Sequence, residues 1–172
     1  IQGEVFLMAT LKTIRKRIVS VRNTQKITKA MKMVAAAKLR RAQNRLLQAR
    51  PYAEKMGELL GILAGLIEGH PLLEGRESPS RAEFLIFTSD KGLCGGFNGN
   101  LLRRIEDFLK NQETVYREVR IHMVGKKGRD FFRARRREME RVEVGFYENF
   151  RFEQAMKMAA DVTGGYLEGK FD

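Results

Sequence analysis

The feature that most constrains this chain is a run of helix-forming residues, without a clear loop signal, from Ala9 to about Ile67. Alanine, leucine, lysine, arginine, glutamine and methionine dominate the run, and all of them favour helix. Thr10 is suited to cap the start of the helix, and Gly69 with Pro71 to stop it. At about 1.5 Å per residue, the run predicts one helix roughly 85 Å long. Pro51 should kink or loosen that helix, because proline has no backbone N–H to donate.

The same run carries the excess positive charge. Between Met8 and Ala53 the chain has thirteen lysines and arginines and no aspartate or glutamate, whereas the whole chain has a formal net charge of +12. These basic residues are Lys12, Arg15, Lys16, Arg17, Arg22, Lys26, Lys29, Lys32, Lys38, Arg40, Arg41, Arg45 and Arg50. A long segment of single-sign charge repels itself and is typical of a surface used against something acidic.

Apolar side chains recur every three or four residues at both ends of the predicted helix. The first set is Leu11, Ile14, Ile18 and Val21, and the second is Ala42, Leu46, Ala49, Ala53, Met56, Leu60, Leu63 and Ile67. Such spacing indicates a coiled-coil seam, which polar residues interrupt from Arg22 to Arg41. A single rod cannot bury its seam against itself. We therefore expect a partner helix, and we expect the chain alone to self-associate or to fold the seam onto its remaining part.

Short strands alternate with amphipathic helices after residue 81. The predicted strands are 82–88, 119–124 and 142–146, and the predicted helices are 99–111, 128–137 and 152–167. This alternation predicts a parallel sheet with right-handed crossovers, so the fold class is α/β with a long N-terminal coiled-coil helix. Another strand is due where the sequence ends at Asp172, and we interpret the chain as a fragment.

The pattern divides the chain into four parts. Residues 1–7 precede a methionine, Met8, that has the context of a natural start, and we interpret them as a non-native or disordered extension. The long helix, a linker and an incomplete α/β domain then occupy residues 8–67, 68–81 and 82–172. A hydrophobic content of 43% and a charged content of 31% are globular values. The longest nearly uncharged apolar run, 59–67, is too short to cross a membrane.

The segment from Thr88 to Asn98 joins the first strand to the next helix, where open α/β sheets usually hold phosphates. Its glycines do not match G-x-G-x-x-G, and no G-x-x-x-x-G-K-[ST] occurs in the chain. The segment 125–128, Gly-Lys-Lys-Gly, also falls short of a phosphate loop. We interpret the glycines as turn residues that permit positive φ, and we predict no cofactor.

Cys94 is the only cysteine, which excludes an internal disulfide and fits a reducing compartment. A catalytic thiol needs a base, and the two histidines of the sequence are His70 and His122. His122 alternates with apolar residues in a predicted strand, so we interpret it as a satisfied sheet residue. Neither paired carboxylates nor metal-ligand spacing occur, so we predict no catalytic residue and no metal site. An enzyme that uses Cys94 is kept as an alternative.

The basic segment has three interpretations. Thirteen cations can replace many counterions of a nucleic acid, but Thr10 to Arg50 contains no Phe, Tyr or Trp to stack on bases and no helix-turn-helix break. A solvated helix face usually includes acids that pair with its bases at i,i+4, and this segment has none. An acidic protein partner is therefore favoured, with a basic nucleic-acid-binding protein as the alternative function.

Four segments carry a resemblance to a known family. They are Met8 to Lys12 (M-A-T-L-K), Asn23 to Lys38 (N-T-Q-K-I-T-K-A-M-K-M-V-A-A-A-K), Arg50 to Ala53 (R-P-Y-A) and Thr88 to Gly96 (T-S-D-K-G-L-C-G-G). Together they resemble the gamma subunit of the F-type ATP synthase, the central rotor shaft. The similarity extends from Met8 to Asp172, roughly the first three-fifths of a typical member.

The resemblance implies two long helices, N- and C-terminal, wound as an antiparallel coiled coil, with a Rossmann-like α/β domain between them that holds no nucleotide. The C-terminal helix is absent from this sequence. The resemblance also implies a non-catalytic subunit that stands inside a hexamer of alpha and beta subunits. Its foot, with the epsilon subunit, rests on the membrane ring of c subunits at the cytoplasmic face of the bacterial inner membrane.

Residue roles follow from the resemblance by position. Contacts with the acidic lever loops of the beta subunits are expected for Thr28, Lys29, Met31, Lys32 and Lys91. Three further residues are expected nearer the foot of the shaft, namely Lys38, Arg40 and Arg41. Proton flow would then be coupled to ATP synthesis or hydrolysis by a peripheral subunit that binds no nucleic acid.

Overall fold

The computed structural model describes residues 2–148 and 150–172, with side chains from Thr10 onward. The chain separates into two units, one ending at Leu66 and the other beginning at Ile67.

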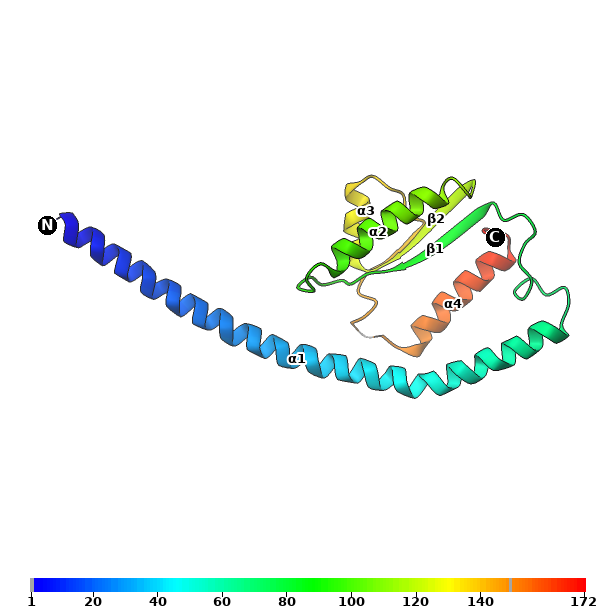
Figure 1. The fold of residues 1–172 in the computed structure, drawn as a ribbon, viewed down its shortest axis with the longest axis horizontal. Helices are drawn as coiled ribbons and strands as arrows, with labels where there is room; N and C mark the ends of the chain where they lie inside the picture. The colour runs from blue at the N-terminus through cyan, green and yellow to red at the C-terminus, as the bar shows by residue number, and fades with distance from the viewer. Residues whose placement is uncertain (1, 149) are drawn as a thin grey trace. The chain divides into compact units, whose positions relative to one another are not determined.

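The first unit is a single helix, α1 (Gln2–Leu66), which Figure 1 shows as a curved rod. It continues through Pro51, so the proline does not end it. The helical run was predicted from Ala9 with Thr10 as its cap, whereas the backbone of α1 is helical from Gln2. The side chains of residues 1–7 lie outside the described ones, and their origin as an extension stays a prediction.

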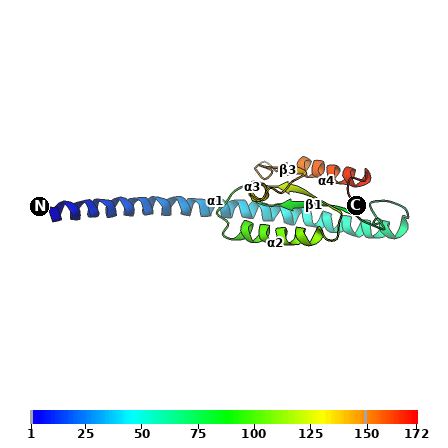
Figure 2. The ribbon, with the colours of Figure 1, turned by 90° about the horizontal axis from the view of Figure 1, so that it is seen from above.

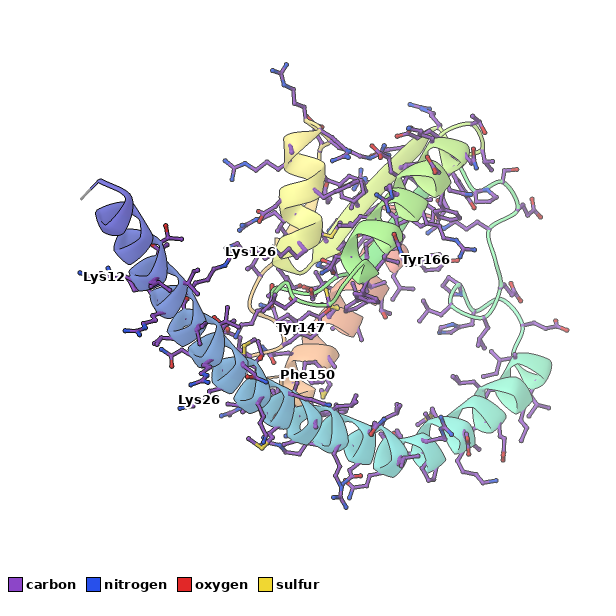
Figure 3. The ribbon with its side chains drawn as sticks, turned by 60° about the vertical axis from the view of Figure 1, so that its left-hand side comes forward. Lys12, Lys26, Lys126, Tyr147, Phe150 and Tyr166 are labelled. Atoms are coloured by element: carbon purple, nitrogen blue, oxygen red, sulfur yellow. The ribbon has the colours of Figure 1, made fainter. Side chains whose placement is uncertain are left out.

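The side chains of α1 are exposed at every position from Thr10 to Leu66. Even the large apolar members of the predicted seam are 38–60% exposed, for example Ile14 at 48% and Leu46 at 60%. Figure 3 shows side chains projecting from the helix along its length. The seam is therefore an exposed apolar stripe. The partner helix that its spacing predicts stays a prediction.

The second unit is a parallel sheet with helices, which confirms the predicted α/β class. Its elements are β1 (Arg81–Phe87), α2 (Phe97–Gln112), β2 (Glu118–Val124), α3 (Lys126–Ala134), β3 (Arg141–Glu143) and α4 (Phe152–Leu167). The strands are in the order β1-β2-β3, and both neighbouring pairs are parallel. Two predicted elements were too long. The third strand stops at Glu143, ahead of a turn in which Gly145 has φ +79°, and α3 stops before Arg136, which has φ +55°.

Helices cover both faces of the sheet (Figure 2). On one face, α2 and α3 pack on β1 and β2 through a core that includes Leu109, Met123 and Phe132, all fully buried. On the other face, Met158 of α4 packs with Val124 and Phe146. Because successive strand residues point to opposite faces, apolar side chains on both sides of β1 and β2 are what this layered arrangement requires.

The chain returns from α4 to the outer edge of β1. The backbone N–H of Asp172 donates to the carbonyl oxygen of Arg81 at 2.8 Å. The Asp172 carboxylate accepts hydrogen bonds from the backbone N–H groups of Ser80 (2.9 Å) and Arg81 (3.0 Å) and from the Arg81 guanidinium (3.0 Å). The Arg81 side chain and these N–H groups hold the pKa of Asp172 well below its usual range.

Candidate functional site

The basic segment of α1, Lys12 to Arg50, covers about 57 Å of helix. All its side chains are exposed, and Figure 3 labels two of them, Lys12 and Lys26. Among the described residues of α1, the one ion pair joins Lys55 and Glu58, at 2.6 Å and beyond the end of the segment. Among the described side chains of α1, no ion pair thus compensates the positive charge of the segment, which makes it an available surface for an anionic partner.

The four helix residues expected to meet the beta lever loops share one region of α1. Thr28, Met31 and Lys32 are three or four residues apart and so lie on one face, and Lys29 neighbours Lys32 at i,i+3. The Thr28 hydroxyl donates to the carbonyl oxygen of Gln25 at 3.0 Å, so its Oγ1 remains available as an acceptor. This face combines two ammonium groups with the flexible apolar side chain of Met31, which is 46% exposed.

The residues expected nearer the foot of the shaft follow about two turns later on α1. Lys38 and Arg41 are neighbours at i,i+3, whereas Arg40 points to another side of the helix. The Arg41 Nε donates to the carbonyl oxygen of Ala37 at 3.4 Å, so this guanidinium lies back along its own helix. All three side chains are exposed.

Lys91 belongs to the second unit, in the loop between β1 and α2. Its Nζ lies 3.5 Å from Oε1 of Glu148, and both side chains are more than 60% exposed, so this pair contributes little stability. Lys91 and the α1 residues belong to separate units. The predicted contact residues are therefore divided between two surfaces, one on α1 and one on the loop after β1.

The N-terminus of α3 occupies the position where a phosphate would bind in an open α/β sheet. Its first N–H groups already have partners: Lys126 donates to Asp90 Oδ1 (2.8 Å), Lys127 to the Ser89 carbonyl oxygen (3.0 Å) and Gly128 to Thr88 Oγ1 (2.9 Å). Oxygen atoms of the chain itself therefore accept the hydrogen bonds that these N–H groups would donate to a bound phosphate.

The two glycines of the 125–128 segment have packing roles. A Cβ on Gly125 would collide with the carbonyl oxygen of Thr88, and one on Gly128 with the sulfur of Met123. Gly125 also has φ +110°, a conformation that strongly favours glycine. The close approach of α3 to the strands, rather than phosphate binding, thus accounts for both glycines.

Cys94 has no catalytic partner among the hydrogen bonds of the described residues. Its exposed sulfur accepts a bond from Nδ2 of Asn98 at 3.0 Å. His70 Nδ1 accepts from the N–H of Leu72, and His122 is bonded to Glu143. Within the described part of the chain, no group of three or more His, Cys, Asp or Glu side chains is arranged to hold a metal ion. The geometry therefore does not support an enzyme that uses Cys94 as its nucleophile.

His122 joins a polar cluster that sequence reasoning missed. The imidazole is 1% exposed, with Nε2 3.0 Å from Glu143 Oε1 on β3 and Nδ1 3.8 Å from Glu83 Oε1 on β1. His122 does lie in a strand, as interpreted, but it is not fully satisfied, because its buried Nδ1 has no hydrogen-bond partner among the described residues. The two carboxylates that flank it were not predicted. The available signal was Glu83, the one acid of β1, which stands between the apolar residues Ala82 and Phe84.

Comparison with known proteins decides the family. The profile of the family described as "ATP synthase" matches residues 10–172. The chain is 47% identical to an ATP synthase gamma chain of Trichlorobacter lovleyi and 46% identical to that of Anaeromyxobacter sp. strain Fw109-5, each over 96% of this chain. It belongs to the ATP synthase gamma chain family. A third member, from Chlorobium phaeobacteroides, is 42% identical, again over 96% of the chain.

The family assignment confirms the resemblance inferred from the four sequence segments. The chain spans 57–58% of the length of these relatives. As a member of this family, the chain corresponds to part of a subunit of ATP synthase, and the comparisons do not support the nucleic-acid-binding alternative. No helix in the described part of the chain combines the length and apolarity that a membrane span requires.

Proposed function

We propose that this chain is the N-terminal part of a non-catalytic rotor shaft. The shaft transmits torque between a proton-driven membrane ring of c subunits and a catalytic hexamer of alpha and beta subunits, and so couples proton translocation to ATP synthesis or hydrolysis. The observation that carries the proposal is the exposed, acid-free basic segment of α1 in a member of the gamma chain family. The subunit lies peripherally at the cytoplasmic face of the bacterial inner membrane and requires no cofactor.

The charge of α1 fits a rotating contact. Diffuse positive charge attracts an acidic collar at every angle, because it does not require interlocked side chains in one orientation. Ala35, Ala36 and Ala37 keep the helix slim within the basic segment, where a partner helix can approach closely. The exposed seam from Ala42 onward supplies an apolar surface for that helix, which in the complete subunit forms an antiparallel coiled coil.

The contacts are assigned to the surfaces described above. Thr28, Lys29, Met31 and Lys32 on α1, together with Lys91 on the loop after β1, meet the acidic lever loops of the beta subunits. The foot of the shaft, which contacts the epsilon subunit and the c ring, lies beyond these residues, and the side chains nearer to it are Lys38, Arg40 and Arg41. Two separate surfaces on one subunit allow both the shaft and the α/β domain to meet the hexamer.

Charge reversal tests the proposal. The full-length subunit would carry Lys29→Glu, Lys32→Glu and Lys91→Glu together, and its binding to the alpha–beta hexamer would be measured at low and high salt. We expect a loss of at least about tenfold in affinity at low salt, which shrinks as salt screens the charges. Coupling of ATP hydrolysis to proton pumping should fall in parallel.

A matched control reverses three exposed cations of the second unit that have no assigned contact, Lys110, Arg117 and Lys157. This control changes the net charge by the same amount and should bind and couple as the unchanged subunit does. Equal binding and coupling of the two triple variants would contradict the proposed function. Duplex DNA serves as a second probe, and binding to it as strong as to the hexamer would favour the nucleic-acid alternative.

A further inference from the structure

Leu93 is the most exposed large apolar residue of the described chain, at 91%. It also has φ +64°, in the left-handed region that a branched residue rarely adopts. The other such residue that is not glycine, Arg136, closes the C-terminal end of α3, where a left-handed conformation is ordinary. Leu93 ends no helix, so both its backbone and its exposure require a different explanation.

The loop around Leu93 is held on both sides by one buried side chain. Asn98 Oδ1 accepts from the N–H of Ser89 at 3.2 Å, and Asn98 Nδ2 donates to Ser89 Oγ at 2.7 Å and to Cys94 Sγ at 3.0 Å. The Ser89 hydroxyl also lies 2.6 Å from the carbonyl oxygen of Lys91. A loop fixed in this way displays Leu93 outward at little further entropic cost when a partner binds.

Two lysine side chains, those of Lys91 and Lys127, lie close to the loop that carries Leu93. The Lys91 side chain is 79% exposed, and Lys127 Nζ lies 3.9 Å from the position that a Cβ on Gly92 would occupy. Phe97, 56% exposed, adds apolar surface at the start of α2. Leu93 is therefore an apolar projection beside two ammonium groups, and the surface complementary to it is an apolar pocket with carboxylates at its rim.

We propose that Leu93 is an apolar anchor that inserts into such a carboxylate-rimmed pocket of a protein partner. The inference rests on the proposed function, because the partner surface is taken to be the acidic loops of the hexamer that Lys91 meets. The two residue types then have different tasks. Lysines accelerate the encounter through long-range attraction, whereas the buried leucine slows dissociation and fixes the position of the α/β domain on the partner.

Substitutions at position 93 separate the apolar contact from the loop conformation. Leu93→Asn keeps a residue that tolerates positive φ but removes the apolar side chain, and Leu93→Met keeps an apolar side chain of similar volume. Val115→Asn is the control, because Val115 is 67% exposed in the loop before β2, at the opposite end of the parallel strands. Each change is made in the full-length subunit, and its dissociation from the alpha–beta hexamer is timed.

We expect Leu93→Asn to raise the dissociation rate about tenfold, while its thermal stability is unchanged or higher. Leu93→Met should remain within about twofold of the unchanged subunit, and so should Val115→Asn. Equal dissociation rates for Leu93→Asn and the unchanged subunit would overturn the anchor and leave the rotor proposal intact, as would an equal loss for Leu93→Met. Failure of the unchanged subunit to bind the hexamer would instead overturn the proposed function, and the anchor with it.

Discussion

The two units of this chain differ in the exposure of their apolar side chains. In the second unit, Leu109, Met123 and Phe132 are fully buried between helices and strands, whereas Leu46 of α1 is 60% exposed. One unit contains its own core, and the other leaves its apolar side chains exposed. The difference teaches that tertiary packing stabilises the second unit, while the described side chains of α1 contribute no buried core to the stability of that helix.

The largest expected difference comes from removing one ring in the core. Phe132→Ala should lower the free energy of unfolding of the second unit by about 3–5 kcal/mol, because it leaves a cavity among Leu109, Met123 and their neighbours. Leu47→Ala on α1 should cost under about 1 kcal/mol, since its side chain lies off the seam and is 58% exposed. Denaturant unfolding of both variants measures the contrast, and equal losses would show that α1 has a buried core of its own.

The seam gives the next largest effect, on association rather than on folding. The isolated chain is expected to self-associate, because the seam residues from Ala42 to Leu63 are exposed and regularly spaced. Leu60→Glu on the seam should shift the chain toward monomer, whereas Ile62→Glu on another side of the helix should not. Sedimentation at several concentrations measures both variants, and a strictly monomeric unchanged chain would refute the expectation.

A pH effect should distinguish the two units as well. The pKa of Asp172 is held below its usual range, so this carboxylate stabilises the second unit above about pH 4 and loses that contribution as the pH falls further. Asp172→Asn should lower the melting temperature of the second unit at pH 7, by less than Phe132→Ala does. The difference between the variant and the unchanged chain should shrink below pH 4, and a difference that does not depend on pH would contradict the account.

The smallest expected effect concerns the helix backbone of α1. Gly57, Gly61 and Gly65 follow one another every four residues, and a Cβ added at any of them would meet no neighbouring atom. Gly61→Ala should therefore stabilise the helix of the isolated chain by roughly 0.5–1 kcal/mol. Circular dichroism during thermal unfolding measures the gain, and a loss of helicity would show that the space beside Gly61 is occupied.

Local signals predicted most of the fold. The periodicity of α4 gave both of its ends, and the alternation of strands and helices gave the parallel sheet. The errors lie at the ends of helices and strands. The helix α1 continues beyond Thr10 towards its N-terminus, and β3 ends just before Gly145, which takes a positive φ. Such choices depend on neighbours that a single sequence does not reveal.

Less of the candidate site was predictable. Charge alone identified the basic segment of α1, because its lack of acids is visible in the sequence. Neither the bonds that fill the N-terminus of α3 nor the exposure of Leu93 follows from any local pattern, since Thr88, Asp90 and Asn98 reach their partners through the fold. The role of Lys91 came from the family resemblance, and its assignment remains a proposal.

Hydrogen exchange along α1 tests the central claim most directly. The amides of residues 12–50 would be followed in the full-length subunit, first free and then assembled with the alpha–beta hexamer. The account predicts that these amides remain helical and become more protected in the assembly, while the already buried strands of the second unit change little. Unchanged or faster exchange of residues 12–50 in the assembled hexamer would contradict a shaft that stands inside an acidic collar.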